Sequence, residues 1–155
     1  MSEMREGMAE IRNQDLYAHV PLMEMLMAEA EAKMGRIDAA IAMIDEQLTK
    51  MERTGQRWVE AETYRVRGQM LLDRQPSDHA AAEDCFNRAI EIARVQQTKS
   101  FELRATLALA KLYHATGRDK MVPELLAPAL AYFNKEVALP ELDEGYRLLD
   151  SITGS

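Results

Sequence analysis

The stretch RTGQRWVEAETYRVRGQMLL, residues 53–72, concentrates residue types that enzymes use in catalysis. It holds the single tryptophan of the chain, Trp58, together with a tyrosine, two glutamates and four arginines. Glu60 and Glu62 stand two positions apart, which places them on different sides of a helix, so they make a poor general acid and base pair. The same residue types also suit helix packing, so the stretch alone does not predict catalysis.

The other reactive side chains do not form a familiar site. His19, His79 and His114 lie far apart and lack the spacing of a metal-binding pair on a helix. Cys85 stands beside Phe86 on a predicted amphipathic helix, which favours a small buried thiol over a nucleophile. The glycine motifs of hydrolases and dinucleotide-binding proteins do not occur. We therefore predict no enzyme, and no catalytic, cofactor-binding or metal-binding residue. A site assembled by the fold alone is left as an alternative.

Length and charge limit the classes further. The 155 residues suit one domain, 1–155, with a core of its own. A net charge of −7 argues against general nucleic-acid binding, which needs a dense basic surface. No apolar run approaches the length of a membrane span, and the acidic N-terminus lacks the features of a signal peptide. We expect a soluble, cytoplasmic protein with no membrane contact.

Apolar residues recur at spacings of three and four almost throughout, so the chain is predicted to be all-α. The expected helices cover residues 3–13, 18–34, 37–54, 57–73, 78–96, 100–115, 119–134 and 140–152. Gly35, Gly55 and Gly117 are expected to end helices in the left-handed conformation. Ser77 and Ser100 are expected to cap the helices that follow them.

An internal repeat of about 41 residues connects these helices. Ala28, Gly68 and Ala110 fall at one repeat position, 40 and then 42 residues apart. In the second helix of each pair the corresponding residues are Ala40, Ala82 and Val122, followed by Ile44, Phe86 and Leu126. Stacked helix pairs approach closely only where side chains are small, and a large residue then fills the space beside them.

This pattern is similar to that of tetratricopeptide repeats, although the period is longer than the usual one of roughly 34 residues. The resemblance implies antiparallel helix pairs stacked in a right-handed superhelix of 7–8 helices. We expect a partial repeat at 3–14, repeats at about 18–55, 57–97 and 100–135, and a C-terminal capping helix at 140–152.

Three stretches resemble a more particular family. RTGQRWVEAETYRVRGQMLL, AAEDCFNRAIEIARVQQTKSFELRATLALAKLY and LLAPALAYF look like the C-terminal helical-repeat region of large bacterial signalling ATPases. Those proteins often carry an adenylate-cyclase domain or a helix-turn-helix domain elsewhere. The resemblance implies a non-catalytic repeat region that contacts partner proteins or neighbouring domains. The chain lacks the phosphate-binding Gly-Lys loop, so the ATPase activity is not carried over.

A repeat protein of this kind binds through the face formed by the first helix of each pair. The candidate groove residues are Glu62, Arg65, Gln69, Arg104, Lys111 and His114, and the same face includes Met25, Glu29 and Leu107. Arg104, Lys111 and His114 share a helical face, and Arg65 is placed to face them. The hypothesis is a basic groove for an acidic or C-terminal peptide. A solvated charged face without a ligand is the alternative.

The N-terminal segment suggests a second surface. Nine of the eleven methionines fall in residues 1–51, where they can fill a core or form an adaptable interface. Met4, Met8 and Ile11 cannot all be covered from one side, so we predict self-association or partner docking there. The sequence thus favours a protein-interaction module that forms homo-oligomers. An alternative is a ligand-sensing or regulatory segment related to a larger signalling ATPase or transcription regulator.

Overall fold

The computed structural model describes residues 2–134 and 136–154, apart from the side chains of residues 2, 8–9 and 11–16. These residues form helices and contain no strand, which confirms the all-α prediction. The helices are α1 (Ser2–Lys33), α2 (Ile37–Thr54), α3 (Glu60–Arg74), α4 (His79–Val95), α5 (Lys99–Ala115), the short 3-10 helix η1 (Asp119–Met121), α6 (Val122–Ala131) and α7 (Pro140–Thr153). They divide into two compact units, Met1–Val59 and Glu60–Ser155.

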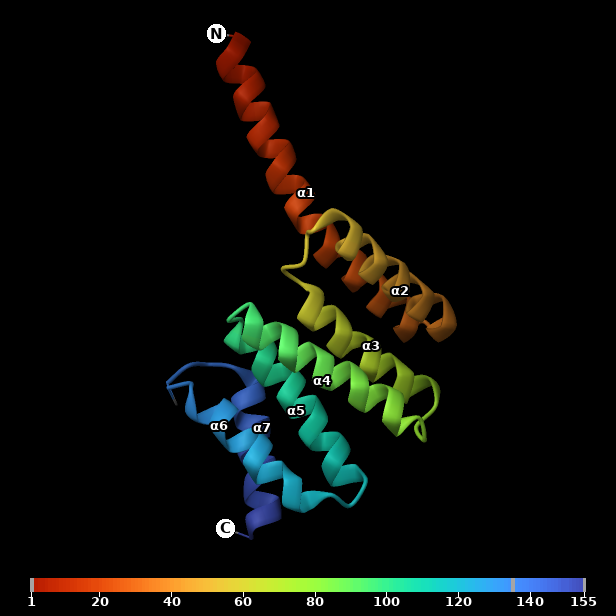
Figure 1. The fold of residues 1–155 in the computed structure, drawn as a ribbon, viewed down its shortest axis with the longest axis vertical. Helices are drawn as coiled ribbons and strands as arrows, with labels where there is room; N and C mark the ends of the chain where they lie inside the picture. Colours follow the sequence, from red (N-terminus) through yellow and green to blue (C-terminus); the bar gives the residue numbers. More distant parts are fainter. Residues whose placement is uncertain (1, 135, 155) are drawn as a thin grey trace. The chain divides into compact units, whose positions relative to one another are not determined.

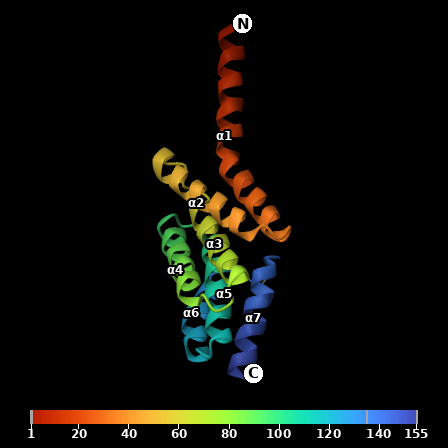
Figure 2. The same cartoon turned by 90° about the vertical axis from the view of Figure 1, so that its right-hand side faces the viewer.

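The first unit is the antiparallel pair of α1 and α2, shown in red and orange in Figure 1. Ala28 on α1 and Ala40 and Ile44 on α2 are fully buried, as the repeat positions predict. The N-terminal half of α1 extends past the end of α2 in both views (Figure 1, Figure 2). Every described side chain before Val20 is exposed.

The sequence predicts two helices where the structure has α1 alone. The break expected near residues 14–17 is wrong, because α1 runs without interruption from Ser2 to Lys33. The segment Gln14–Tyr17 contains no glycine or proline, and glutamine and leucine favour helices. The prediction rested on repeat register, which does not by itself terminate a helix.

Pro21 lies inside α1, where it cannot donate a backbone hydrogen bond. Its own carbonyl accepts a hydrogen bond from the side-chain amide of Gln47 on α2, and Gln47 is buried. The repeat pattern predicts an alanine at position 47. The longer glutamine side chain instead connects α2 to α1 beside the proline.

The second unit continues the alternation of antiparallel helices. α3 packs against α4, α5 packs against both of these helices, and α7 packs against α5 and α6 (Figure 1). Its core includes Ala82, Phe86, Ala110, Val122 and Leu126, each fully buried. These are the predicted repeat positions. Their burial confirms that the small and large residues alternate across the helix crossings.

Gly68 shows how close one of these crossings is. A Cβ atom at this position would lie 2.6 Å from Cε1 of Phe86 and 3.1 Å from Cβ of Cys85. The absence of a side chain therefore lets α3 approach α4 while Phe86 fills the space beside it. Cys85 is buried, as predicted.

The predicted helix C-termini at glycines are confirmed, whereas the predicted N-caps at serines are wrong. Gly35, Gly55 and Gly117 have φ values of 85°, 76° and 75°, which confirms the left-handed conformation. Ser77 and Ser100 do not cap helices, because α4 begins after Asp78 and α5 begins after Thr98. Neither of these N-cap residues makes a side-chain capping hydrogen bond.

A tryptophan at the start of a predicted helix in a repeat protein is expected to pack in the core, but Trp58 does not. It is 42% exposed, and its indole N–H donates a hydrogen bond of 2.8 Å to the carbonyl of Ala18 on α1. The His19 ring makes an edge contact with the indole, with centroids 6.5 Å apart. The indole N–H needs a hydrogen-bond acceptor or water, which explains why Trp58 lies at the surface and not in the core. Trp58 thus fastens the segment before α3 to α1.

No described helix is both long enough and apolar enough to cross a membrane.

Candidate functional site

The six predicted groove residues lie on two neighbouring helices of the second unit. We call them the α3–α5 strip: Glu62, Arg65 and Gln69 on α3, and Arg104, Lys111 and His114 on α5. An ion pair of 2.8 Å between Nη1 of Arg104 and Oε1 of Glu62 joins the two helices. Of the predicted residues, Glu62 and Arg104 are therefore in direct contact across the two helices.

Glu62 is the centre of the α3–α5 strip. Its side chain is 3% exposed, and its two carboxylate oxygens accept hydrogen bonds of 3.0 and 2.7 Å from Arg65 on the same helix. Arg104 approaches the same carboxylate from α5. A buried carboxylate needs such partners, because its desolvation is otherwise strongly unfavourable. Glu62 therefore positions both guanidinium groups.

Two carboxylates on α7 complete the surface. Arg104 Nε lies 3.1 Å from Oε1 of Glu141, and the ammonium group of Lys111 pairs with Glu144. Arg65, Arg104 and Lys111 are thus matched by Glu62, Glu141 and Glu144. This balance corrects the expectation of a basic groove. Sequence reasoning missed both α7 residues, although their spacing of three, on a helix expected to have a polar face, was an available signal.

The remaining strip residues are exposed and locally paired. Gln69 donates a hydrogen bond of 2.9 Å to Asp73 one turn along α3. His114 Nδ1 lies 2.7 Å from Oδ1 of Asp119, and both side chains are about half exposed. Lys111 and His114 therefore form the open end of the α3–α5 strip, where water reaches the charged atoms.

Not every residue predicted on this face is accessible. Met25 and Leu107 are 4% and 3% exposed, so both belong to the cores of their units. Glu29 is half-buried on α1. The repeat register correctly predicts that these residues are helical. It does not predict the rotation of each helix about its axis, which decides whether a side chain is buried or exposed.

A second set of charged residues stabilises the α4–α5 turn. Glu102 accepts hydrogen bonds of 2.9 Å from Arg94 and 3.2 Å from Lys99. Burial raises the pKa of the Glu102 carboxyl, but the hydrogen bonds from Arg94 and Lys99 outweigh it and hold the pKa below its ordinary value. The group is therefore ionised at neutral pH and holds the start of α5 to the end of α4.

Tyr113 and Arg118 meet Glu83 on the other end of this helix pair. The Tyr113 hydroxyl donates to Glu83 at 3.2 Å, and Arg118 donates to the same carboxylate at 2.9 Å. Burial, followed by the charge of Glu83, raises the pKa of Tyr113. The Arg118 guanidinium also lies 4.3 Å from the centroid of the Tyr113 ring. These contacts connect the start of α4 to the end of α5 and the turn that follows it.

The histidines, cysteine and acidic residues of the described chain do not form any group of three or more that could hold a metal ion. His19 contacts Trp58, and His114 contacts Asp119. The charged groups of the strip are held in ion pairs across α3, α5 and α7. Such an arrangement suits recognition of another chain by charge and hydrogen bonding.

The predicted self-association residues are only partly described. Met4 is 71% exposed on the extended half of α1. The side chains of Met8 and Ile11 lie outside the described residues. Further along α1, Met23 and Met27 are 57% and 59% exposed, and Met34, in the turn after the helix, is 58% exposed. The spacing of four places Met23 and Met27 on one side of the helix.

The tetratricopeptide repeat family model matches residues 20–95. Residues 20–95, just under half of the chain, are therefore similar to tetratricopeptide repeats. The matched segment covers α2, α3 and α4 together with the C-terminal part of α1. Proteins with these repeats generally bind other proteins, and the repeats themselves are typically non-catalytic. No curated protein and no solved structure matches the chain. The link to signalling ATPases remains a prediction from sequence resemblance.

Proposed function

We propose that this tetratricopeptide repeat chain is a non-catalytic interaction module whose α3–α5 strip binds a segment of a partner protein. The observation that carries the proposal is the row of ion pairs that connects α3, α5 and α7 through Arg104. Arg104 is fixed between two carboxylates, one of them buried, so its donors are oriented before a partner arrives. Preorganised groups lose less entropy on binding.

At the open end of the strip, the ion pair between Lys111 and Glu144 can be replaced by a contact with a partner protein. Lys111 and Glu144 are 52% and 47% exposed, and exposed ion pairs contribute only about 0–1 kcal/mol to stability. A carboxylate of a partner can therefore replace Glu144 on Lys111 at little cost. His114 lies one turn further along α5 and can donate a hydrogen bond to the same partner segment. We therefore expect the partner to present an acidic residue here.

A charge reversal tests this surface. Lys111→Glu should sharply reduce the recovery of a protein partner in a quantitative pull-down, because it replaces the cation at the open end with a second carboxylate beside Glu144. Lys50→Glu is the matched control, since Lys50 is also half exposed and ion-paired, with Glu24, but belongs to the other unit. Equal recovery of all partners with wild type and Lys111→Glu would exclude binding at the strip.

We also propose that the chain self-associates through α1. The observation that favours this is the pair of exposed methionines Met23 and Met27, one turn apart on the helix whose N-terminal half extends past α2. Large exposed apolar side chains that lie together on one helix face are typical of interfaces. Their thioethers adapt readily to a second surface.

Light scattering after size exclusion, over a range of protein concentrations, tests the self-association. We expect a homodimer for wild type and a monomer for the Met23→Glu, Met27→Glu double variant. Met121→Glu is the control, because Met121 is also a half-exposed methionine but lies on η1. A wild-type monomer at the highest concentration would exclude self-association. The ligand-sensing role remains the alternative, which thermal-shift screening against nucleotides and metabolites would detect.

A further inference from the structure

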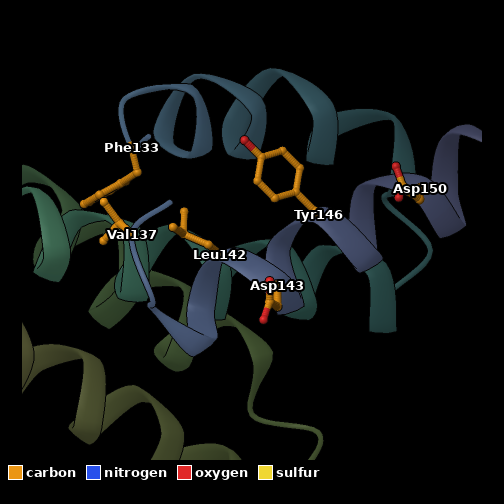
Figure 3. A pocket seen from close by; sticks show the side chains of 6 residues that line it. All are labelled: Phe133, Val137, Leu142, Asp143, Tyr146 and Asp150. Carbon is orange, nitrogen blue, oxygen red and sulfur yellow. The ribbon is translucent and has the colours of Figure 1, made fainter. Parts of the chain in front are cut away.

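The second unit contains a pocket of about 380 Å³ beside α7. Its lining comes from the segment between α6 and α7 and from one side of α7: Phe133, Val137, Leu142, Asp143, Tyr146 and Asp150. Figure 3 shows Phe133, Val137 and Leu142 gathered at one end and the Tyr146 ring standing between α7 and the helix above it. Asp143 and Asp150 lie on either side of Tyr146 along α7 (Figure 3).

This pocket is on the side of α7 that faces away from the α3–α5 strip. At 100° per residue, positions 143, 146 and 150 lie within about 60° of one another. Positions 141 and 144 lie about 100–180° away from them around the helix. Glu141 and Glu144 pair with α5, so the pocket is a separate surface. Binding at the pocket and binding at the strip can therefore succeed or fail independently.

The two sides of α7 differ in how their carboxylates are compensated. Glu141 and Glu144 each pair with a cation of α5. Asp143 and Asp150 have no ion pair with any residue that the structure describes. The chain as a whole carries a net charge of −7. The pocket side of α7 is thus electrostatically complementary to a cation supplied from outside.

The residues that line the pocket indicate which type of cationic side chain fits it best. Leu142 is buried, Phe133 and Tyr146 are half-buried, and Val137 is 43% exposed, so an aliphatic chain has apolar surface to cover. A guanidinium group can stack on an aromatic ring and also donate two hydrogen bonds to one carboxylate. An ammonium group is more strongly hydrated and lacks the planar donor pair.

We propose that this pocket receives an arginine side chain of a partner protein. The aliphatic stem covers Leu142 and Val137, the guanidinium stacks against Tyr146, and one of the two aspartates accepts its hydrogen bonds. The pocket thereby adds a second contact to the interaction module, with a charge preference opposite to that of Lys111.

The test uses the isotope-labelled full chain and a capped tripeptide, acetyl-Gly-Arg-Gly-amide, followed by NMR chemical shifts. The matched peptide has citrulline in place of arginine, which keeps the shape and removes the charge. We expect the arginine peptide to shift the amides of Leu142, Tyr146 and Asp150 and to bind about fivefold more tightly than the citrulline peptide. A lysine peptide should bind more weakly than the arginine peptide.

Two double variants distinguish the pocket from general attraction to an acidic protein. Asp143→Asn with Asp150→Asn should abolish the preference for arginine over citrulline. Asp84→Asn with Glu91→Gln removes the same charge from exposed positions on α4 and should preserve the preference. Thermal unfolding by circular dichroism verifies that both variants fold.

Three results would overturn the proposal. Equal binding of the arginine and citrulline peptides would show that the charge is not recognised. Equal loss in both double variants, or shifts outside the pocket, would indicate non-specific attraction. Lysine binding as tight as arginine would exclude selection of the guanidinium group.

Discussion

Gly68 illustrates how a single atom limits the packing of this protein. The space between α3 and α4 leaves no room for a Cβ at this position, because Cε1 of Phe86 would lie 2.6 Å away. Phe86 is fully buried and Cys85 Cβ is also close, so neither neighbour moves freely. At position 68 the backbone of α3 therefore packs directly against the Phe86 side chain of α4.

We expect Gly68→Ala to lower the free energy of unfolding by about 1–3 kcal/mol, because overpacking forces side chains or helices apart. Urea unfolding measures the change. The double variant Gly68→Ala, Phe86→Leu should lose less stability than the sum of the two single variants, since the smaller side chain makes room for the new methyl group. Additive losses would show that the two residues do not share the crossing.

The contribution of the single residue Glu102 to stability is predicted to depend on pH. Its pKa in the fold lies below the ordinary value of 4.5, so its contribution to stability is present above that value and is lost as the pH falls through the lowered pKa. Glu102→Gln should therefore destabilise the protein at neutral pH, on the order of 1 kcal/mol. The difference from wild type should shrink in acid.

Urea unfolding of wild type and Glu102→Gln at several pH values tests this dependence. Glu91→Gln is the control, because Glu91 is exposed and pairs with Arg88 at 3.4 Å. That variant should have the stability of wild type at every pH. A Glu102→Gln effect that does not change with pH would contradict the role of the ionised carboxylate.

At the scale of the element, glycines have opposite roles in the first unit. Gly55 ends α2 with a φ of 76° and donates its N–H to the carbonyl of Met51. Gly7 lies within α1, and a Cβ there would meet nothing within 4 Å. The first position needs the conformational freedom of glycine, whereas at the second position this freedom only weakens the helix.

The same substitution should therefore have opposite effects at these two positions. Gly55→Ala should destabilise the end of α2 by about 1 kcal/mol, because a side chain disfavours the left-handed conformation. Gly7→Ala should stabilise the local helix by about 0.5–1 kcal/mol. Amide hydrogen exchange in α1 and α2 measures both. Slower exchange around residue 55 in Gly55→Ala would contradict the cap.

Helix α7 shows how one element can serve two surfaces. Glu141 and Glu144 face α5, while Tyr146 and the two aspartates line the pocket on the other side. Gly145 lies between these sides and packs on Leu130, whose Cδ2 would be 2.7 Å from an added Cβ. The close approach to α6 thereby sets the rotation of α7 and the direction of both charged faces.

At the scale of the whole molecule, the largest group of buried apolar residues belongs to one unit. The core cluster that contains Phe86, Leu109 and Leu126 runs from Ala82 to Leu142. A pair of helices such as α1 and α2 has less buried surface to offset the entropy of folding. The two units should therefore differ in their ability to fold alone.

We expect a fragment of residues 60–155 to unfold cooperatively by itself and a fragment of residues 1–59 to have little stable structure. Circular dichroism during thermal and urea unfolding compares each fragment with the full chain. A gradual, non-cooperative transition for the 60–155 fragment would contradict this division. Added helicity when the two fragments are mixed would measure the stabilisation that each provides to the other.

Repeat positions could be predicted from the sequence because local packing requires a particular residue size there. Ala28, Gly68 and Ala110 are small because two helices cross at them, and this requirement recurs with the period. The glycines at helix ends were equally predictable, since few other residues take a positive φ. Continuity of α1 and the exposed position of Trp58 were not predicted.

Part of the α3–α5 strip could also be predicted from the periodicity of the sequence. Helical spacing placed Arg104 and Lys111 on one face of one helix, and the repeat register placed Glu62 next to them. Glu141 and Glu144 could not be assigned as their partners, because that pairing depends on the rotation and position of α7 against α5. The sequence therefore predicted the cations and missed their neutralisation.

The amino-acid sequence by itself determined the all-α class, the repeated small residues and the side chains available to the strip. Each of these depends on interactions within one helix or between repeat positions that recur along the chain. Only the tertiary structure decided that the strip is charge-balanced and that Asp143 and Asp150 line a pocket with Tyr146. Ion pairs and pockets form between atoms distant in sequence, so they depend on helix rotations that periodicity does not specify.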